Sequence, residues 1–337
     1  MTTAPAIAAP VAEVGHRPRS ARLALADRIF RSLTGASALA VLLLMSLVGA
    51  FLGYRAAQAL HVAGWSFLTT ASWEPDAHHF GIAAVLTGTV LIGLVAVAIA
   101  LPLALGTALY ISEYAPRRLR GLLVSLVDLM AAVPSVVYGL WGFYFLQQHA
   151  FGLSRWLATY LGWFPLFHVD GADPRDPLAP LTVYKSSTLI AGIVVALMVT
   201  PIACSVMREA FSQAPLGERE GAYALGATRW GMIRTVVLPF GRGGIIGGTM
   251  LGLGRALGET IAVFMVIAVV FAVQPHILQN GGSSVSSMIA LLYGSASAFG
   301  TSALMAAGLA LFALTLAVNF AASAIVARSR SGASSDI

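Results

Sequence analysis

The chain has 337 residues, of which 58% are hydrophobic and only 10% are charged, and its mean hydropathy is +0.83. Soluble domains carry about 25% charged residues, so a chain this poor in charge could not cover its own surface in water. The composition therefore excludes an ordinary cytosolic enzyme and a disordered protein, and it predicts an all-α polytopic membrane protein. The net charge is +6, but the basic residues are not interleaved with aromatic residues in any single patch, so we expect no nucleic-acid partner.

Six segments are long and apolar enough to be membrane-spanning helices, each of which needs about 20 such residues. They are predicted at residues 33–54, 80–112, 121–149, 186–207, 243–272 and 301–327. The third contains Asp128, and the fifth contains Arg255 and Glu259. A polar break at 279–284 precedes the last helix. The apolar residues 288–293 leave three possibilities open, namely a span, a re-entrant segment or an interfacial one.

The distribution of arginine predicts the orientation, because cytoplasmic loops carry an excess of Lys and Arg. With the N-terminus inside, most arginines fall on inside segments, and the outside loops hold only Arg55, Arg155, Arg175 and Lys185. Both termini are therefore predicted to be cytoplasmic, with the protein in the cell membrane and in contact with its lipids. The Ala/Pro/Thr-rich start of the chain is typical of a flexible tail.

The outer loop after the third span is long enough to have structure of its own. Apolar residues recur at helical spacing in residues 153–161, which predicts a short helix lying at the membrane surface. A turn-rich, solvated loop is expected at residues 170–177. The histidines of the outer loops are interpreted as solvated side chains, and no metal site is predicted.

No nucleotide-hydrolysing motif is found in the chain. A P-loop requires Gly-x-x-x-x-Gly-Lys-Ser/Thr, and the only lysine, Lys185, follows Tyr184. We therefore expect no catalytic residue and no cofactor on this chain. Gly244, Gly248 and Gly252 recur every fourth residue, which predicts a face of the fifth helix that a neighbouring helix can approach closely.

The cytoplasmic segment between the fourth and fifth spans resembles the EAA loop of ABC-importer permeases, and residues 218–239 are called the EAA-like loop below. The residues that carry the resemblance are Glu220, Ala222, Gly226, Leu238 and Pro239. Position 221 is Gly where the family prefers Ala, and Gly226 allows a sharp turn of the chain. The resemblance implies that a short helix here docks into a groove of an ATP-hydrolysing subunit and couples to it, with ATP and Mg on that partner.

Three further motifs narrow the family. They lie at residues 110–118, 131–139 and 254–260, and they are similar to the corresponding segments of permeases of the phosphate-specific transport (Pst) system. An acidic residue shortly before the second motif, here Asp128, resembles the PstC-type subunit of that system. The resemblance covers roughly residues 80–327.

Fold, partners and activity follow from this resemblance as expectations. It implies a MetI-like permease core of five helices at 80–327. A first transmembrane helix and outer loop (33–79) would precede the core, and cytoplasmic tails would lie at 1–32 and 328–337. The chain would form half of the pore of an ATP-driven phosphate importer. Its implied partners are a PstA-type permease subunit, two copies of an ATP-binding subunit and an extracytoplasmic phosphate-binding protein.

The charges in the fifth span are candidates for the substrate pathway. A charged residue near a bilayer centre costs about 2.5–3.5 kcal/mol on insertion scales, so such residues tend to face a protein interior or a water-filled path. Arg255 and Glu259 are four residues apart, and on one helix they are expected to share a face and to pair. The guanidinium of Arg255 offers forked donors to phosphate oxygens. A purely structural ion pair is the alternative, and Asp128 is either a pathway residue or an interhelical hydrogen-bond partner.

The rest of the predicted pathway consists of Thr260, which ends the third motif, and of Pro134 and Ser135 in the third span. A proline in a helix frees a carbonyl and kinks the helix, and a serine or a neighbouring helix can satisfy the freed group. Such a bend is useful at a gate and is also common in membrane helices without one.

Two other functions stay open on the sequence alone. One is a secondary oxyanion transporter, in which Asp128, Arg255 and Glu259 act as a proton relay and no ATPase is needed. The other is an ABC permease for sulfate or molybdate, because these anions are tetrahedral like phosphate.

Overall fold

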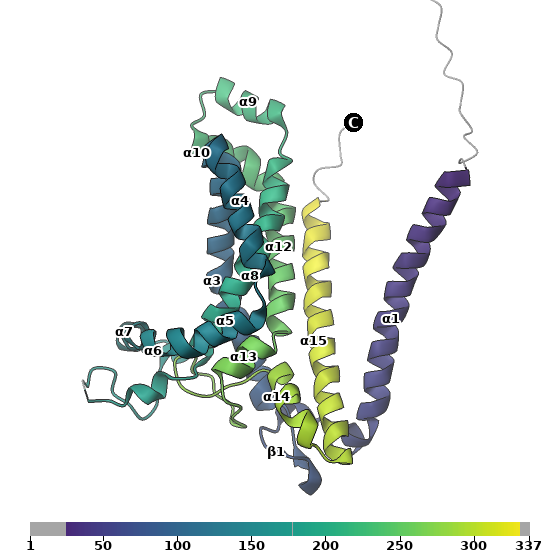
Figure 1. The fold of residues 1–337 in the computed structure, drawn as a ribbon, viewed down its shortest axis with the longest axis vertical. Coiled ribbons are helices and arrows are strands. Elements are labelled where there is room, and N and C mark those ends of the chain that lie inside the picture. The colour runs from purple at the N-terminus through teal and green to yellow at the C-terminus, as the bar shows by residue number, and fades with distance from the viewer. Residues whose placement is uncertain (1–24, 177, 331–337) are drawn as a thin grey trace, which may run out of the picture. The chain divides into compact units, whose positions relative to one another are not determined.

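The computed structural model describes residues 25–176 and 178–330, and it is built almost entirely of helices (Figure 1). The predicted tails therefore lie largely outside the described residues. The chain forms two compact units, residues 1–50 and 51–337. The first described helix, α1 (Leu25–Ala63), begins in the first unit and ends in the second.

Four described helices are long and apolar enough to cross a membrane, and two pairs of bent helices qualify when each pair is taken as one span. The four are α1, α3 (Ala83–Leu109) with its π-helical end η2 (Tyr110–Tyr114), α8 (Thr188–Ser212) and α15 (Ala298–Arg330). The pairs are α4 (Arg117–Ala132) with Ser135–His149, bent by 88°, and Arg229–Phe240 with α12 (Arg242–Leu257), bent by 65°. The predicted number of six spans is confirmed on this count.

The third span is broken, whereas one kinked helix over 121–149 was predicted. α4 ends at Ala132, and α5 (Ser135–Trp141) starts in a new direction and continues into η3 (Gly142–Leu146) and α6 (Gln147–His149). Val133 and Pro134 between them are extended, with ψ of 129° and 142°. Proline disfavours the helical conformation of the residue before it, so the chain turns here rather than bending gently.

The fifth helix is shorter than the predicted 243–272. α12 ends at Leu257 with Gly258 as its C-cap, and α13 (Ile261–Val266) follows as a separate helix. From 267 to 284 the chain is non-helical, and its backbone pairs with the outer loop through Ile277 N–H to Leu166 C=O at 2.9 Å and Asn280 N–H to Val183 C=O at 2.7 Å. Protein partners thus replace the hydrogen bonds that lipid cannot supply. An apolar run does not by itself distinguish a helix from such a segment.

The apolar residues 288–293 do not form a span. They belong mostly to α14 (Val285–Leu292), whose 8 residues rise about 12 Å against a hydrocarbon thickness of about 30 Å. Ser284 and Ser287 form a capping box that starts this helix. The short helix η7 (Tyr293–Ser295) then leads into α15.

The centre of the second unit is formed by α3, α8 and α12, which lie side by side (Figure 1). Small residues allow this close packing. A Cβ added at Gly244, Gly248 or Gly252 of α12 would collide with α8, at Ala210, Ala203 and Val199 respectively. The predicted glycine face of the fifth helix is therefore confirmed, and its neighbour is α8.

The short elements gather at two opposite ends of these helices (Figure 1). At one end lie α9 (Leu216–Ala224), α10 (Arg229–Met232), η6 (Ile233–Val237) and α11 (Leu238–Phe240). At the other lie α7 (Phe151–Leu161), α13, α14 and the antiparallel pair β1 (Trp73–Glu74) and β2 (His79–Phe80). The remaining short helices are α2 (Ser66–Thr69), η1 (Pro75–Ala77), η4 (Pro165–Phe167) and η5 (Leu181–Tyr184). The helix α7 confirms the one predicted over 153–161.

The loop that carries η4 and η5 is held by an apolar cluster as well as by its backbone hydrogen bonds to residues 277 and 280. Tyr184 is 1% exposed and packs with Val169, Leu189 and Leu278. Its hydroxyl has no hydrogen-bond partner in the described part of the chain. Burial raises the pKa of the Tyr184 phenol. Two nearby charges have smaller effects on this pKa, since Arg155 lowers it and Asp173 raises it.

Candidate functional site

The EAA-like loop forms a helix, a tight turn and a second helix. α9 ends in a left-handed turn at Gly226, whose φ is +82°. Leu225 N–H, Gly226 N–H and Ala227 N–H bond back to carbonyls of α9, which is how a helix end is commonly closed. Thr228 then caps α10, because its hydroxyl accepts the Gly231 N–H at 3.1 Å. The sharp turn predicted at Gly226 is therefore present.

The helix α9 and the residues that follow it expose several large apolar side chains. Leu225 is 91% exposed and Leu216 is 75% exposed, and Trp230 and Tyr223 are also exposed. Glu220 is exposed beside them, and Ala222 is half-buried against the apolar residues under the loop. Such a patch at the end of a membrane helix bundle is the kind of surface that marks a protein contact.

Leu238 and Pro239, which the sequence groups with this loop, occupy a different position. They form α11, the turn that leads into α12. Leu238 is half-buried and Pro239 is exposed. They connect the loop to the helix that carries Arg255.

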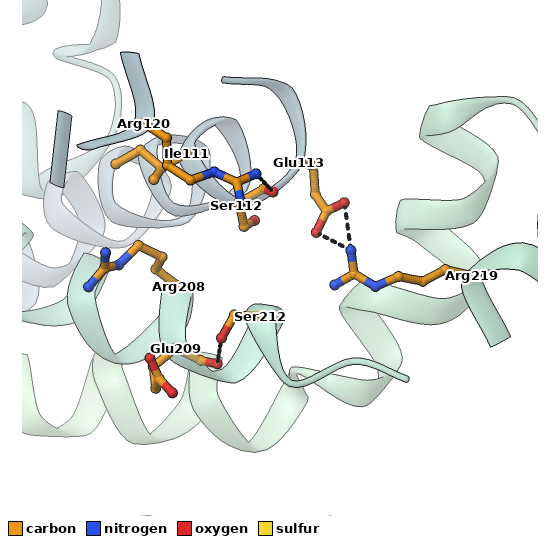
Figure 2. A pocket seen from close by; sticks show the side chains of 8 residues that line it. All are labelled: Ile111, Ser112, Glu113, Arg120, Arg208, Glu209, Ser212 and Arg219. Atoms are coloured by element: carbon orange, nitrogen blue, oxygen red, sulfur yellow. Dashed lines mark hydrogen bonds and ion pairs between the residues drawn. The ribbon is translucent and has the colours of Figure 1, made fainter. Parts of the chain in front are cut away.

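An ion pair that the sequence did not single out fixes α9 to the membrane helices. Arg219 Nη1 donates to both carboxylate oxygens of Glu113, each at 3.0 Å (Figure 2). The same guanidinium donates to the carbonyls of Phe211 at 2.6 Å and Ala214 at 3.2 Å. Glu113 is 5% exposed and belongs to η2 at the end of α3. In the sequence it ends a long uncharged run and lies within the 110–118 motif, but nothing there names its partner.

A cavity of about 200 Å³ lies beside this pair (Figure 2). It is lined by Ile111, Ser112, Glu113, Arg120, Arg208, Glu209, Ser212 and Arg219. Arg120 closes it on the α4 side by donating to the Ser112 carbonyl at 2.5 Å. Charged groups of both signs from four helices therefore meet at this end of the bundle.

Arg255 and Glu259 do not form the ion pair that their spacing predicts. α12 ends at Leu257, between the two residues, so they share no helix. Arg255 lies in the last turn of α12, is exposed, and forms no hydrogen bond or ion pair with any described residue. The prediction of a shared helix face was wrong because Gly258, a poor helix former, ends the helix before Glu259 is reached.

Glu259 is 8% exposed and serves the start of the next helix. Its carboxylate Oε1 accepts the Ala262 N–H of α13 at 3.2 Å. The hydroxyls of Ser286 and Ser284 donate to its backbone carbonyl at 2.7 and 3.4 Å. The adjacent Thr260 is half-buried and donates its hydroxyl to the Gly258 carbonyl at 3.3 Å. The serines before and within α14 thus hold the backbone of Glu259, whereas the Thr260 side chain bonds, among the described residues, only to Gly258.

The remaining predicted pathway residues lie on and after α4. The Asp128 side chain is exposed on α4, without an ion pair to a described residue. Pro134 is exposed and Ser135 is half-buried at the break of the third span. The carbonyl freed at this break is that of Met130. It accepts the Tyr138 hydroxyl at 2.9 Å and the Val133 N–H at 3.3 Å. Tyr138, rather than a serine, therefore supplies the side-chain donor to this carbonyl.

The end of the bundle that carries α7 holds one small cluster of ionisable side chains. The Asp170 carboxylate lies 3.4 Å from His168 Nε2 and 3.1 Å from His276 Nδ1. Within 25–176 and 178–330, no group of three or more His, Cys, Asp or Glu side chains is arranged to hold a metal ion.

Comparison with known proteins identifies the family. Residues 100–331 match the model of the binding-protein-dependent transport system inner membrane component family. The phosphate transport system permease protein PstC 2 of Mycobacterium tuberculosis is 37% identical over 306 residues, which cover 89% of this chain and 91% of that protein. The phosphate transport system permease protein PstC of Mycobacterium leprae is 39% identical over 282 residues, 82% of this chain and 85% of that protein.

Solved structures agree with the fold. The crystal structure of a bacterial ABC transporter involved in the import of alginate, an acidic polysaccharide, contains a chain with a TM-score of 0.52 and 18% identity. The match covers 89% of this chain and 99% of that one, and at this identity it bears on the fold alone. The family match is to a transport component of the inner membrane rather than to an enzyme. The chain therefore belongs to the family of binding-protein-dependent transport system inner membrane components, and the relatives that it resembles over most of its length are phosphate transport system permeases of the PstC type.

Proposed function

We propose that this chain is a permease subunit of an ATP-driven importer of inorganic phosphate and forms half of its translocation pore. One observation carries the proposal. Relatives that are 37% and 39% identical over more than four-fifths of this chain are named phosphate transport system permeases. The importer would use a PstA-type permease as the other half of the pore and an extracytoplasmic phosphate-binding protein to deliver the anion.

ATP hydrolysis is assigned to two copies of a partner subunit that dock on the EAA-like loop. The support is the exposed apolar surface of Leu216, Tyr223, Leu225 and Trp230 next to the exposed carboxylate of Glu220. A helix that presents apolar side chains to a groove is a common mode of docking. Closure of the ATPases would push α9, and the pore would alternate between inward- and outward-facing states.

Phosphate is proposed to pass the exposed cation of Arg255. A guanidinium stays charged in proteins, and its exposure within a span is costly unless it faces water or a partner chain. Arg255 lies in the last turn of α12, where the carbonyl end of the helix favours a cation. Asp128, Pro134, Ser135, Glu259 and Thr260 are assigned to the same pathway.

The proposed orientation puts α9 and α10 in the cytoplasm and α7 outside, with both termini inside. It is supported by the positions of these helices at opposite ends of the second unit (Figure 1) and by the excess of arginine on the inner segments. We keep the domain boundaries at 1–32, 33–79, 80–327 and 328–337, with 80–327 as the permease domain.

The experiment that tests this function is uptake by cells that lack the chain. We expect such cells to lose binding-protein-dependent uptake of labelled phosphate and to regain it when the chain is restored, while sulfate uptake is unchanged. Loss of sulfate or molybdate uptake instead would assign the other oxyanion. Uptake that persists without any ATP-binding subunit would assign the chain to the secondary transporters and leave the EAA-like loop without a role.

A further inference from the structure

The polar attachment of α9 to the rest of the described chain depends on one side chain. Among the residues that the structure describes, Arg219 forms every side-chain hydrogen bond between α9 and other elements. No residue of α9 is fully buried, and its exposed side chains form part of the proposed docking surface. Besides the chain at its two ends and the packing of Ala222, this guanidinium is the contact through which a force applied to α9 reaches the membrane helices.

Arg219 makes contact with two spans at once. Its bonds to Glu113 join it to the end of α3, and its bonds to the carbonyls of Phe211 and Ala214 join it to the end of α8 and the residues just after it. These two spans pack against each other and against α12, which carries Arg255. A continuous path of packed elements thus leads from α9 to the proposed substrate pathway.

The burial of the pair makes this attachment firm. The side chain of Glu113 is 4% exposed and that of Arg219 is 17% exposed. Separating a buried carboxylate from its cation leaves an uncompensated charge, so the pair strongly resists being pulled apart. An apolar contact, being non-directional, would let a short helix slide over the ends of α3 and α8.

We propose that the Glu113–Arg219 ion pair is the link that transmits movement of α9 to the membrane helices, with Arg219 and Glu113 acting as positioning residues. The inference rests on the proposed docking of an ATPase at the EAA-like loop, and it does not depend on which anion is transported. It differs from docking itself, because neither side chain belongs to the exposed surface of the loop.

A matched control lies in the same cavity. Arg208 of α8 lines it beside the pair, and no described residue forms a hydrogen bond or ion pair with Arg208. Arg208→Gln therefore removes one arginine from this place without touching the link. Glu113→Gln keeps the shape and one oxygen acceptor of the wild-type residue, so it changes the charge with little change in packing.

The test uses the full complex in membranes and a readout that needs no transported anion. Cys204 is replaced by Ser, and a cysteine is introduced at Leu251, which is 53% exposed one turn before Arg255. Reactivity of that cysteine with a maleimide is measured with and without ATP. Association of the ATPase subunit and the rate of ATP hydrolysis are measured in the same preparations. The variants are Glu113→Gln, Arg219→Gln and Arg208→Gln.

We expect ATP to change the labelling in the parent and in Arg208→Gln. In Glu113→Gln and in Arg219→Gln the change should fall about tenfold, while ATPase association and hydrolysis persist. A normal ATP-driven change in both variants would overturn the proposal. A loss of association together with the change would also overturn it, because the pair would then be needed only to hold the loop in shape. A parent complex that binds no ATPase would overturn the docking proposal as well.

Discussion

The Tyr138 hydroxyl donates a hydrogen bond of 2.9 Å to the Met130 carbonyl, across the break at Val133–Pro134 that turns the third span by 88°. Met130 lies on α4 and Tyr138 on α5, so this bond joins the two halves of the span. It also satisfies a carbonyl that a continuous helix would have paired internally. The turn is thereby fixed by a side chain as well as by proline.

Removing that hydroxyl tests the contribution of the bond. Tyr138→Phe leaves the Met130 carbonyl with only the Val133 N–H, at 3.3 Å, and we expect a loss of about 0.5–1.5 kcal/mol in stability. The measurement is the thermal inactivation midpoint of the purified complex. Tyr144→Phe is the control, since Tyr144 is 66% exposed and its hydroxyl bonds to no described residue. Equal midpoints for Tyr138→Phe and the parent would mean that proline alone fixes the turn.

Gly226 is expected to be required for its backbone conformation and not for space. Its φ is +82°, and a Cβ added there would meet no atom within 4 Å. A left-handed conformation costs a β-branched residue about 1–2 kcal/mol, so Gly226→Val should distort the loop and weaken ATPase association and uptake. Gly226→Asn should retain more of both, because Asn tolerates this conformation.

The neighbouring Gly221 is the control for that prediction. It lies within α9, also with open space around it. Gly221→Ala should leave association unchanged or improve it, because Ala favours a helix by about 1 kcal/mol over Gly. Normal ATPase association and uptake in Gly226→Val would show that the turn has no part in coupling.

The proposed orientation predicts that position 175 faces outward and position 229 inward. Both side chains are exposed. Cysteines placed at Arg175 and Arg229, in a chain in which Cys204 is replaced, should react with an impermeant reagent from opposite sides of the membrane. Labelling of position 175 from the cytoplasmic side would reverse the orientation.

Arg255 is predicted to be needed for transport but not for assembly. Arg255→Gln should abolish phosphate uptake, and Arg255→Lys should impair it, because an ammonium cannot reproduce the forked donors of a guanidinium. Arg242→Gln, at the other end of α12 and also exposed, is the control for loss of an arginine from this helix. Uptake and the amount of purified complex are measured together.

A substitution at Glu259 can distinguish the effect of its charge from its part in starting α13. In Glu259→Gln the side-chain oxygen can still accept the Ala262 N–H, so the start of α13 should be preserved while the charge is lost. The double variant Arg255→Gln with Glu259→Gln should also fail to transport. Substantial uptake by that double variant would exclude Arg255 as an anion site and leave it a packing residue.

The sequence predicted the features that depend on composition and local chemistry. Long apolar runs gave the number of spans, the fourth-residue glycines gave the α12 face that packs on α8, and Gly226 gave the turn after α9. Each of these is decided by residues close together in the chain. Pro134 was correctly placed at a change of direction, but the size of the turn depends on what α5 packs against.

The sequence could not predict features that depend on distant partners. The end of α12 at Leu257 is not marked by a loss of hydrophobicity, because residues 261–273 are all apolar although the chain is non-helical from 267 to 284. The ion pair of Glu113 with Arg219 joins residues 106 positions apart, and neither has a local signal that names the other. Pairing Arg255 with Glu259 was wrong for a local reason, since spacing implies contact only while the helix continues and α12 ends before Glu259.

Transport by the purified complex tests the central claim most directly. The chain is assembled with its permease and ATPase partners in vesicles, supplied with the binding protein, and ATP is placed on the side of the ATPase. The account predicts uptake of labelled phosphate that requires ATP, is lost in Arg255→Gln and is not reduced by excess sulfate. Uptake of sulfate in preference to phosphate, or phosphate uptake that continues without ATP, would contradict it.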